Sequence, residues 1–308
     1  MKISNPASAL AVLLLITGVV ACKKNIDEVI VPPVNNPNTD TTKVVTDTIV
    51  VAYPQQKTTR CPGAPDYGDT ILYVQPSTTD YIVTPINHPD TGTYFAWPQG
   101  MVIDKNTGAI NVTKSEGGLR YNIGYVKKGT TDTCVQTLIL GGVSYEDSLY
   151  VLNDDERYAK PYFDADPSIT SICDPSNGSG GNGCKFDING QLGSQFVVVD
   201  HNTGVIDLKN TSKLAFGLIP LNGTTVNATM LYQVNDNSNM APQKITLTFI
   251  YYNKKSDVPP GLLTLVTDKL NKILNQVLLI NLLGNSSNAA IKAGNPRPPI
   301  IIVTRSAQ

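Results

Sequence analysis

The chain has 308 residues, a formal net charge of −1, and a composition that is 41% hydrophobic and 16% charged. This hydrophobic content can fill sizeable cores, and the scattered Lys and Arg residues exclude an electrostatic nucleic-acid binder. The sequence lacks the nucleophile-elbow, zinc-protease, phosphate-loop and dinucleotide motifs, and it contains two histidines. We therefore expect no catalytic residues, no enzyme and no nucleic-acid partner.

The first 21 residues have the organisation of an export signal. Lys2 makes the start positive, and the apolar run from Ala9 to Val20 is shorter than the roughly 20 residues that a membrane span needs. Val19-Val20-Ala21-Cys22 resembles a lipobox, in which the signal is cleaved before a cysteine that then carries lipid. The resemblance implies that residues 1–21 are a signal peptide and that Cys22 anchors the mature chain to a membrane.

Residues 22–60 are predicted to be a tether with one candidate strand at 44–53. Pro, Asn and Thr dominate residues 23–42, where the chain has little to bury. Lys23–Glu28 resembles the signal that directs Bacteroidota-type lipoproteins to the outer face of the outer membrane. This resemblance implies an outer-membrane lipoprotein on the cell surface rather than the periplasmic face.

A seven-residue turn motif begins at Asp104 and returns at Asp200. Asp and Asn favour turns closed by their own side chains, and Gly enters the left-handed region without steric cost. A β-prone run precedes each copy and an alternating run follows it, so each copy predicts a hairpin turn. The positions that define the two turns are Asp104, Asn106, Gly108, Asp200, Asn202 and Gly204.

The lead-in Pro98–Asp104 makes the first copy resemble the turn of bacterial putative-immunoglobulin and cadherin-like repeats; the second copy lacks the Pro and Gly of this lead-in. The resemblance implies a β-sandwich around each turn. Short predicted strands at intervals of about 8 to 12 residues favour the same architecture. We predict an all-β fold with two tandem immunoglobulin/cadherin-like β-sandwiches, module one over 61–153 and module two over 158–254.

Residues 257–308 are predicted to form a C-terminal extension with an amphipathic helix and a strand. The helix spans 262–283, with a polar stripe that includes Thr264, Thr267 and Lys269. The strand at 298–303 needs a partner edge. Two interpretations stay open for the helix: packing on module two, which we favour, and docking on a partner or a membrane.

Four cysteines remain once Cys22 is assigned to the lipid. An even number outside the cytoplasm predicts two disulfides, with three possible connectivities. We favour Cys61–Cys134 in module one and Cys173–Cys184 in module two, where the second bridge closes the Gly-rich loop 174–183.

An acidic cluster lies near the junction of the predicted modules. Cadherin-like tandems bind calcium at such junctions, so the resemblance implies a calcium site as an alternative to a solvated acidic linker. No other cofactor is expected. The candidate ligands are Asp154, Asp155, Glu156, Asp164 and Asp166.

Together these features favour a non-enzymatic, lipid-anchored protein of the cell envelope with a structural or protein-binding, adhesion-like role. The alternative is a glycan-binding accessory lipoprotein of a polysaccharide-uptake system. Sugar platforms favour tryptophan, and Trp97 is the single tryptophan of the chain, which weighs against the alternative. The identity of a protein or glycan partner is left open.

Overall fold

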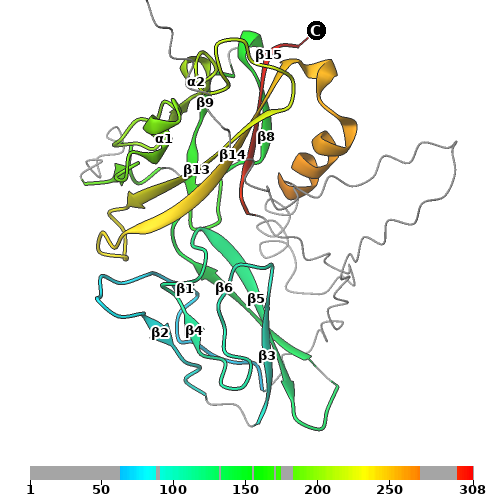
Figure 1. Cartoon of the computed structure of the whole chain (residues 1–308). Coiled ribbons are helices and arrows are strands. Elements are labelled where there is room, and N and C mark those ends of the chain that lie inside the picture. Colours follow the sequence, from blue (N-terminus) through cyan, green and yellow to red (C-terminus); the bar gives the residue numbers. More distant parts are fainter. Residues whose placement is uncertain are drawn as a thin grey trace, which may run out of the picture.

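The computed structural model describes residues 63–87, 91–131, 133–154, 156–169, 171–174, 183–270 and 297–307. The described chain is all-β, as predicted: its strands form sheets, and its helices are few (Figure 1). The predicted signal peptide, the tether and both Cys22 and Cys61 lie outside the described residues.

The smaller of two sandwich-like units is built on a four-stranded sheet. In spatial order its strands are β1 (Ile71–Leu72), β6 (Thr133–Leu140), β5 (Leu119–Lys127) and β3 (Gly92–Trp97). The pair β2 (Ile82–Val83) and β4 (Ile110–Asn111) carries residues of the same core. Alternate residues of β5 are buried, because one face of a half-covered strand meets the core. The core therefore gathers Tyr121 and Ile123 from β5 with Ile110 and Leu138.

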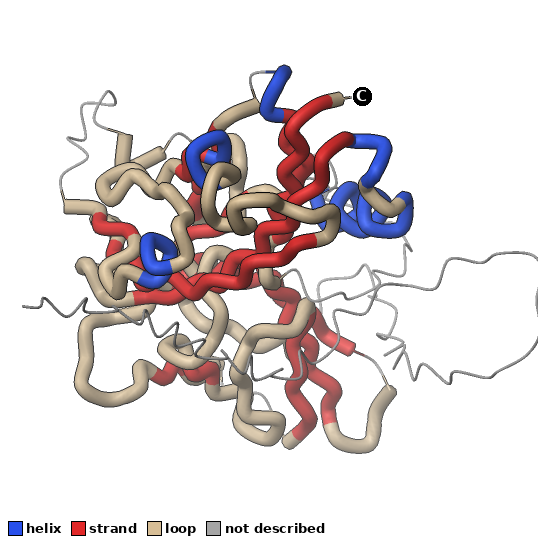
Figure 2. Tube along the Cα trace, turned by 45° about the horizontal axis from the view of Figure 1, so that its top comes forward, coloured by secondary structure: helices blue, strands red, loops and turns tan. Residues whose placement is uncertain are grey.

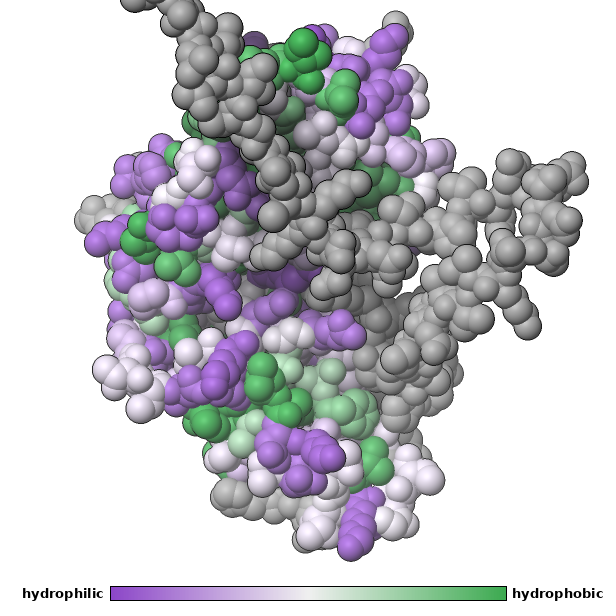
Figure 3. All heavy atoms as spheres, viewed as in Figure 1, coloured by the Kyte–Doolittle hydropathy of each residue, from purple (hydrophilic) through white to green (hydrophobic). Residues whose placement is uncertain are grey.

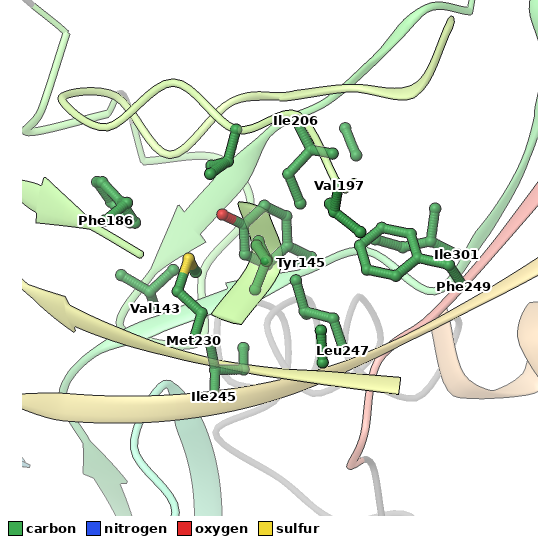
Figure 4. Packing of buried hydrophobic residues seen from close by; sticks show 14 of the residues in the cluster. Val143, Tyr145, Phe186, Val197, Ile206, Met230, Ile245, Leu247, Phe249 and Ile301 are labelled. Atoms are coloured by element: carbon green, nitrogen blue, oxygen red, sulfur yellow. The ribbon is translucent and has the colours of Figure 1, made fainter. Parts of the chain in front are cut away.

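The larger unit is built on a five-stranded sheet (Figure 2). Its strands are, in order, β11 (Lys185–Phe186), β13 (Thr224–Gln233), β14 (Gln243–Lys254), β15 (Ile300–Ser306) and β8 (Ser148–Val151). The shorter pairs are β7 (Val143–Tyr145) with β10 (Pro161–Phe163), and β9 (Tyr158–Ala159) with β12 (Ile206–Asp207). The short helical elements are η1 (Leu152–Asp154), α1 (Gln191–Ser194), α2 (Leu208–Thr211) and η3 (Lys255–Asp257). Figure 4 shows how Tyr145, Leu247 and Phe249 meet in the core of the larger unit.

Strands β7 and β8 pack with the larger unit, although both lie within the range predicted for module one. Val143 and Tyr145 belong to the larger core, and β8 pairs in parallel with β15. The alternation of a strand shows which residues are buried but not which sheet buries them, so the sequence does not place these strands. The ranges 61–153 and 158–254 stay predictions about which segments fold independently.

The C-terminal strand lies inside the larger sheet, parallel to both β14 and β8. Ile301 and Val303 face the larger core, while Ile300 and Ile302 face a second cluster under the helix at 260–270. A strand covered on both faces reads as a continuous apolar run, which is the pattern of β15. No helix among the described residues is long and apolar enough to cross a membrane.

The helix at 260–270 packs on the sheet through Leu262 and Val266, as the favoured interpretation expects for this part of the predicted helix. One residue of the predicted polar stripe, however, is buried rather than exposed. Lys269 is 8% exposed, and its Nζ lies 2.8 Å from Asp147 Oδ1 and donates to the carbonyl of Pro298. A helical pattern cannot reveal a buried partner that lies far away in the chain.

Candidate functional site

Both repeat turns have the same local geometry. Asp104 Oδ1 accepts backbone N–H groups from Asn106 at 2.9 Å and Thr107 at 2.8 Å. Asp200 Oδ1 accepts the matching groups of Asn202 at 2.9 Å and Thr203 at 2.8 Å. Gly108 and Gly204 have φ values of 72° and 73°, in the region that glycine enters without steric cost. Each turn thus joins two short β segments, and its polar residues act structurally.

The surroundings of the two turns match as well. Tyr67 donates its hydroxyl to the carbonyl of Gly108 at 2.7 Å, and Tyr145 donates to Gly204 at 2.6 Å. A Cβ on either glycine would lie 2.6 Å from an aromatic ring carbon, of Tyr94 for Gly108 and of Phe186 for Gly204. The two turns therefore have matching surroundings, with one tyrosine hydroxyl and one aromatic ring at each glycine.

The described acidic residues near the predicted junction each accept hydrogen bonds from the protein. Glu156 accepts the N–H of Val151 at 2.7 Å, Asp164 accepts the hydroxyl of Tyr73 at 2.8 Å, and Asp166 accepts both donors of Ser168. No three His, Cys, Asp or Glu side chains come together within the described part of the chain. Asp155 and the side chain of Asp154 lie outside it, so the calcium hypothesis stays a prediction.

Cys173 and Cys184 are joined by a disulfide, with their Cα atoms 5.8 Å apart. Both residues are buried in the core of the larger unit, so the bridge ties the ends of the Gly-rich loop to that core. Cys134 is also disulfide-bonded. Its predicted partner, Cys61, lies outside the described residues, so that pairing stays a prediction.

Direct hydrogen bonds join the two units. Tyr73 of the smaller unit donates to Asp164, and Gln75 donates to the carbonyl of Asn237 at 2.9 Å. From the C-terminal side, Arg297 donates to the carbonyls of Gly117 and Val143. Burial, followed by the hydrogen bond to Asp164, raises the pKa of Tyr73, so its hydroxyl stays a donor at physiological pH. The units are therefore docked rather than merely linked.

A cleft of about 260 Å³ lies between the docked units. The smaller unit lines it with Thr113, Ser115 and Gly117, and the larger unit lines it with residues that include Gln243 and Lys244. Gln243 accepts the hydroxyl of Tyr232 at 3.1 Å, but its amide nitrogen is buried without a hydrogen-bond partner in the described structure. A buried donor left unpaired is costly, so this nitrogen is the group most ready to donate a hydrogen bond to a ligand oxygen.

Glu116 lies between two residues that line the cleft, and one of its carboxylate oxygens is also buried without a described partner. Burial raises the pKa of Glu116, while the charges of Arg297 and Lys244 act in the opposite direction. The amide of Gln243 and the ammonium of Lys244 at this cleft suit a polar ligand that accepts hydrogen bonds. No sequence signal pointed to this site, because its lining residues come from both units and meet only through docking.

His201, the histidine whose position is described, serves the second turn. Its Nδ1 lies 2.8 Å from the carbonyl of Phe186. The backbone N–H of Phe186 donates in turn to the carbonyl of His201 at 2.8 Å. His201 therefore holds β11 against the turn, while His88 lies outside the described residues.

Comparison with known proteins finds only weak similarities to solved structures. No family model and no curated protein matches the sequence. Two structures of human protocadherin-24 EC1-2 match at 9% identity, covering 61% of this chain and 97% or 96% of theirs, with TM-scores of 0.18 and 0.20.

A SusE-like surface-located polysaccharide-binding protein from the Bacteroides thetaiotaomicron heparin utilisation locus matches at 10% identity. The match covers 58% of this chain and 32% of that protein, with a TM-score of 0.20. TM-scores this low do not indicate a shared overall fold, so neither likeness assigns a function.

Proposed function

We propose that this chain is a non-enzymatic, lipid-anchored protein of the cell envelope with a structural or protein-binding role at the cell surface. The observation that carries the proposal is the docking of two β-units by direct hydrogen bonds. Docked sandwiches hold their end loops at fixed positions, as display of a binding surface requires. The Cys173–Cys184 disulfide and the predicted export signal support an oxidising compartment outside the cytoplasm.

The lipid anchor is tested by labelling growing cells with radioactive palmitate. We expect label in the native chain, because Cys22 would be acylated, and none in Cys22→Ser. The native chain should also sediment with membranes after a salt wash, since acyl chains do not depend on charge. Absence of label from the native chain would overturn the anchor.

The protein-binding role is tested by chemical cross-linking on intact cells that make the native chain. We expect a discrete larger species that contains a second protein. A Cys22→Ser chain, released from the membrane, should lose this species if the partner is membrane-bound. Cross-linking that never yields a species with a second protein would contradict the protein-binding role.

A second candidate function, glycan binding, is favoured by the cleft between the units. The unpaired amide nitrogen of Gln243 and the ammonium of Lys244 match the acceptor oxygens of a sugar ring. The cleft is small, about 260 Å³, so it would take a single sugar residue or the end of a chain.

Glycan binding is tested by affinity electrophoresis in gels that contain plant or host polysaccharides. We expect retardation of the native chain and its loss in Gln243→Ala/Lys244→Ala. The matched control is Lys185→Ala/Gln191→Ala, which removes the same two residue types at positions that do not line the cleft. Native mobility in every gel would remove this candidate, and equal retardation of both variants would place sugar binding elsewhere.

A further inference from the structure

The loop at 214–221, between α2 and β13, carries the most exposed large apolar side chains of the described residues. Leu218 is 88% exposed, Ile219 is 85% exposed and Leu221 is 69% exposed. Leu214, at the start of the loop, adds a fourth exposed side chain. Isolated surface leucines need no explanation, but a contiguous apolar group of this kind marks an interaction site.

The loop is held on a fixed base. Phe216 is buried, and its ring lies 5.3 Å from the ring of Tyr251 in β14. The N–H of Thr224 donates to the carbonyl of Leu221 at 3.1 Å, and that of Gly223 donates to the carbonyl of Tyr251 at 2.8 Å. The apolar tips are therefore presented outward by an anchored loop.

Basic residues lie near both ends of this loop. Lys209 and Lys213 lie just before it in the chain, and both are exposed. Asn222 accepts the N–H of Asn253 at 2.7 Å, which brings exposed Lys254 and Lys255 to the same end of the larger unit. Asp257 also lies at this end and accepts the amide of Asn222 at 3.0 Å. Figure 3 shows hydrophobic and hydrophilic residues side by side at this end of the molecule.

The chemistry of the loop fits a lipid surface better than a protein. Protein hot spots are enriched in Trp, Tyr and Arg, whereas Leu is under-represented in them and Lys is depleted from interfaces. Aliphatic side chains ringed by lysines are instead the pattern of segments that lie in a membrane interface. There the aliphatic groups enter the acyl boundary and the lysines meet anionic headgroups.

We propose that the loop at 214–221 inserts into the surface of an anionic lipid membrane, with Lys209, Lys213, Lys254 and Lys255 on the headgroups. The proposal rests on the envelope location proposed above, where such a surface is available. It adds to the lipid anchor a second contact that would fix the orientation of the larger unit on the membrane.

The test uses the mature chain, 22–308, with Cys22→Ser, so that no acyl chain contributes. We expect this chain to float with vesicles of phosphatidylglycerol and phosphatidylcholine and to bind pure phosphatidylcholine weakly. Leu218→Asp/Ile219→Asp should reduce binding by about tenfold or more, because two apolar side chains lose their insertion. The matched control, Ile86→Asp/Val102→Asp, changes two exposed apolar residues of the smaller unit and should bind as before.

A second measurement reports insertion directly. Ile219→Trp should give a blue-shifted emission when anionic vesicles are added, whereas the chain with buried Trp97 alone should not change. Equal flotation of the loop variant and the control would overturn the proposal, as would the absence of any shift. If the loop instead cross-links to a surface protein, and vesicles bind neither the Cys22→Ser chain nor its loop variant, the lipid assignment is wrong. Palmitate labelling at Cys22 decides the anchor separately.

Discussion

The glycine of each repeat turn lies between a tyrosine hydroxyl and an aromatic ring. Its carbonyl accepts the hydroxyl of Tyr67 or Tyr145, while its Cα faces Tyr94 or Phe186. Both the positive φ and the close ring exclude a side chain at these positions.

Gly108→Ala and Gly204→Ala are therefore expected to lower the free energy of unfolding by more than about 1–2 kcal/mol, since backbone strain and a ring clash add. The control is Gly217→Ala, which has φ +89° but no atom within 4 Å of the new Cβ. It should cost about 1 kcal/mol. Urea unfolding measures all three, and equal losses would show that the aromatic contact has no energetic role.

Asp207 is expected to make the stability of the fold sensitive to acid. The hydrogen bond from Arg157 is the main cause that holds the pKa of Asp207 below its usual range, and Asp207 also accepts the N–H of Asn210 at 2.9 Å. A lowered folded pKa gives stability that is present above the unfolded pKa of about 3.9 and lost as pH falls through the folded value.

Asp207→Asn should therefore lower the unfolding free energy by about 1 kcal/mol at neutral pH and by less below about pH 4. Asp69→Asn, at an exposed position, is the control and should leave the unfolding free energy at neutral pH unchanged. Thermal melting between pH 2 and 7 makes the comparison; a loss that stays constant over this range would rule out the ion pair as its origin.

At this scale the sequence predicts the turns well and their surroundings poorly. Asp, Asn and Gly carry their turn preference locally, so both turns follow from their residues. Tyr67 and Tyr145 lie 41 and 59 residues from the glycines they contact. No local pattern indicates such pairs.

Among the elements, β15 depends most on contacts that are distant in the chain. It is flanked on both sides by parallel strands, and an ion pair fixes its start. Asp147 Oδ1 accepts the N–H of Ile300 at 2.7 Å and lies 2.8 Å from Lys269 Nζ. Asp147 is 1% exposed, and burial raises its pKa even though Lys269 acts in the opposite direction.

Lys269→Met should lower the unfolding free energy by about 3–5 kcal/mol, because it leaves the carboxylate buried without its cation. A carboxyl with a raised folded pKa contributes stability below the unfolded pKa and loses it as pH rises through the folded one. The deficit should therefore shrink toward pH 4. Adding Asp147→Asn should recover most of the loss at neutral pH, and a double variant no more stable than Lys269→Met would contradict the pairing.

The strands were predictable as strands, whereas their partners were not. Alternation predicts β5 and β14 as strands, and an apolar run predicts β15. Neither pattern identifies the strand that lies next to them in the sheet. The insertion of β15 between β14 and β8 follows from cores on both faces of the sheet, which only the folded chain reveals.

The whole molecule combines two related units with different additions. Each unit has its turn, its tyrosine and its hairpin, while the larger one adds β15 and the helix at 260–270. The matching turns could be predicted from the repeated motif. The cleft could not, because it arises from docking.

Chelation tests the calcium hypothesis at this scale. We expect the same melting temperature with and without a chelator, since Glu156, Asp164 and Asp166 already accept hydrogen bonds from the protein. A melting temperature that falls on chelation and returns with calcium would contradict this expectation and direct attention to Asp154 and Asp155.

The most direct test of a cell-surface location is digestion of intact cells with a protease that cannot cross the outer membrane, followed by immunoblotting. Cells with permeabilised outer membranes serve as the control that the folded chain can be cut. We expect loss of the full-length band in intact cells, because both units would face the outside. Full protection in intact cells, with digestion in permeabilised ones, would contradict a surface role and place the protein on the periplasmic side.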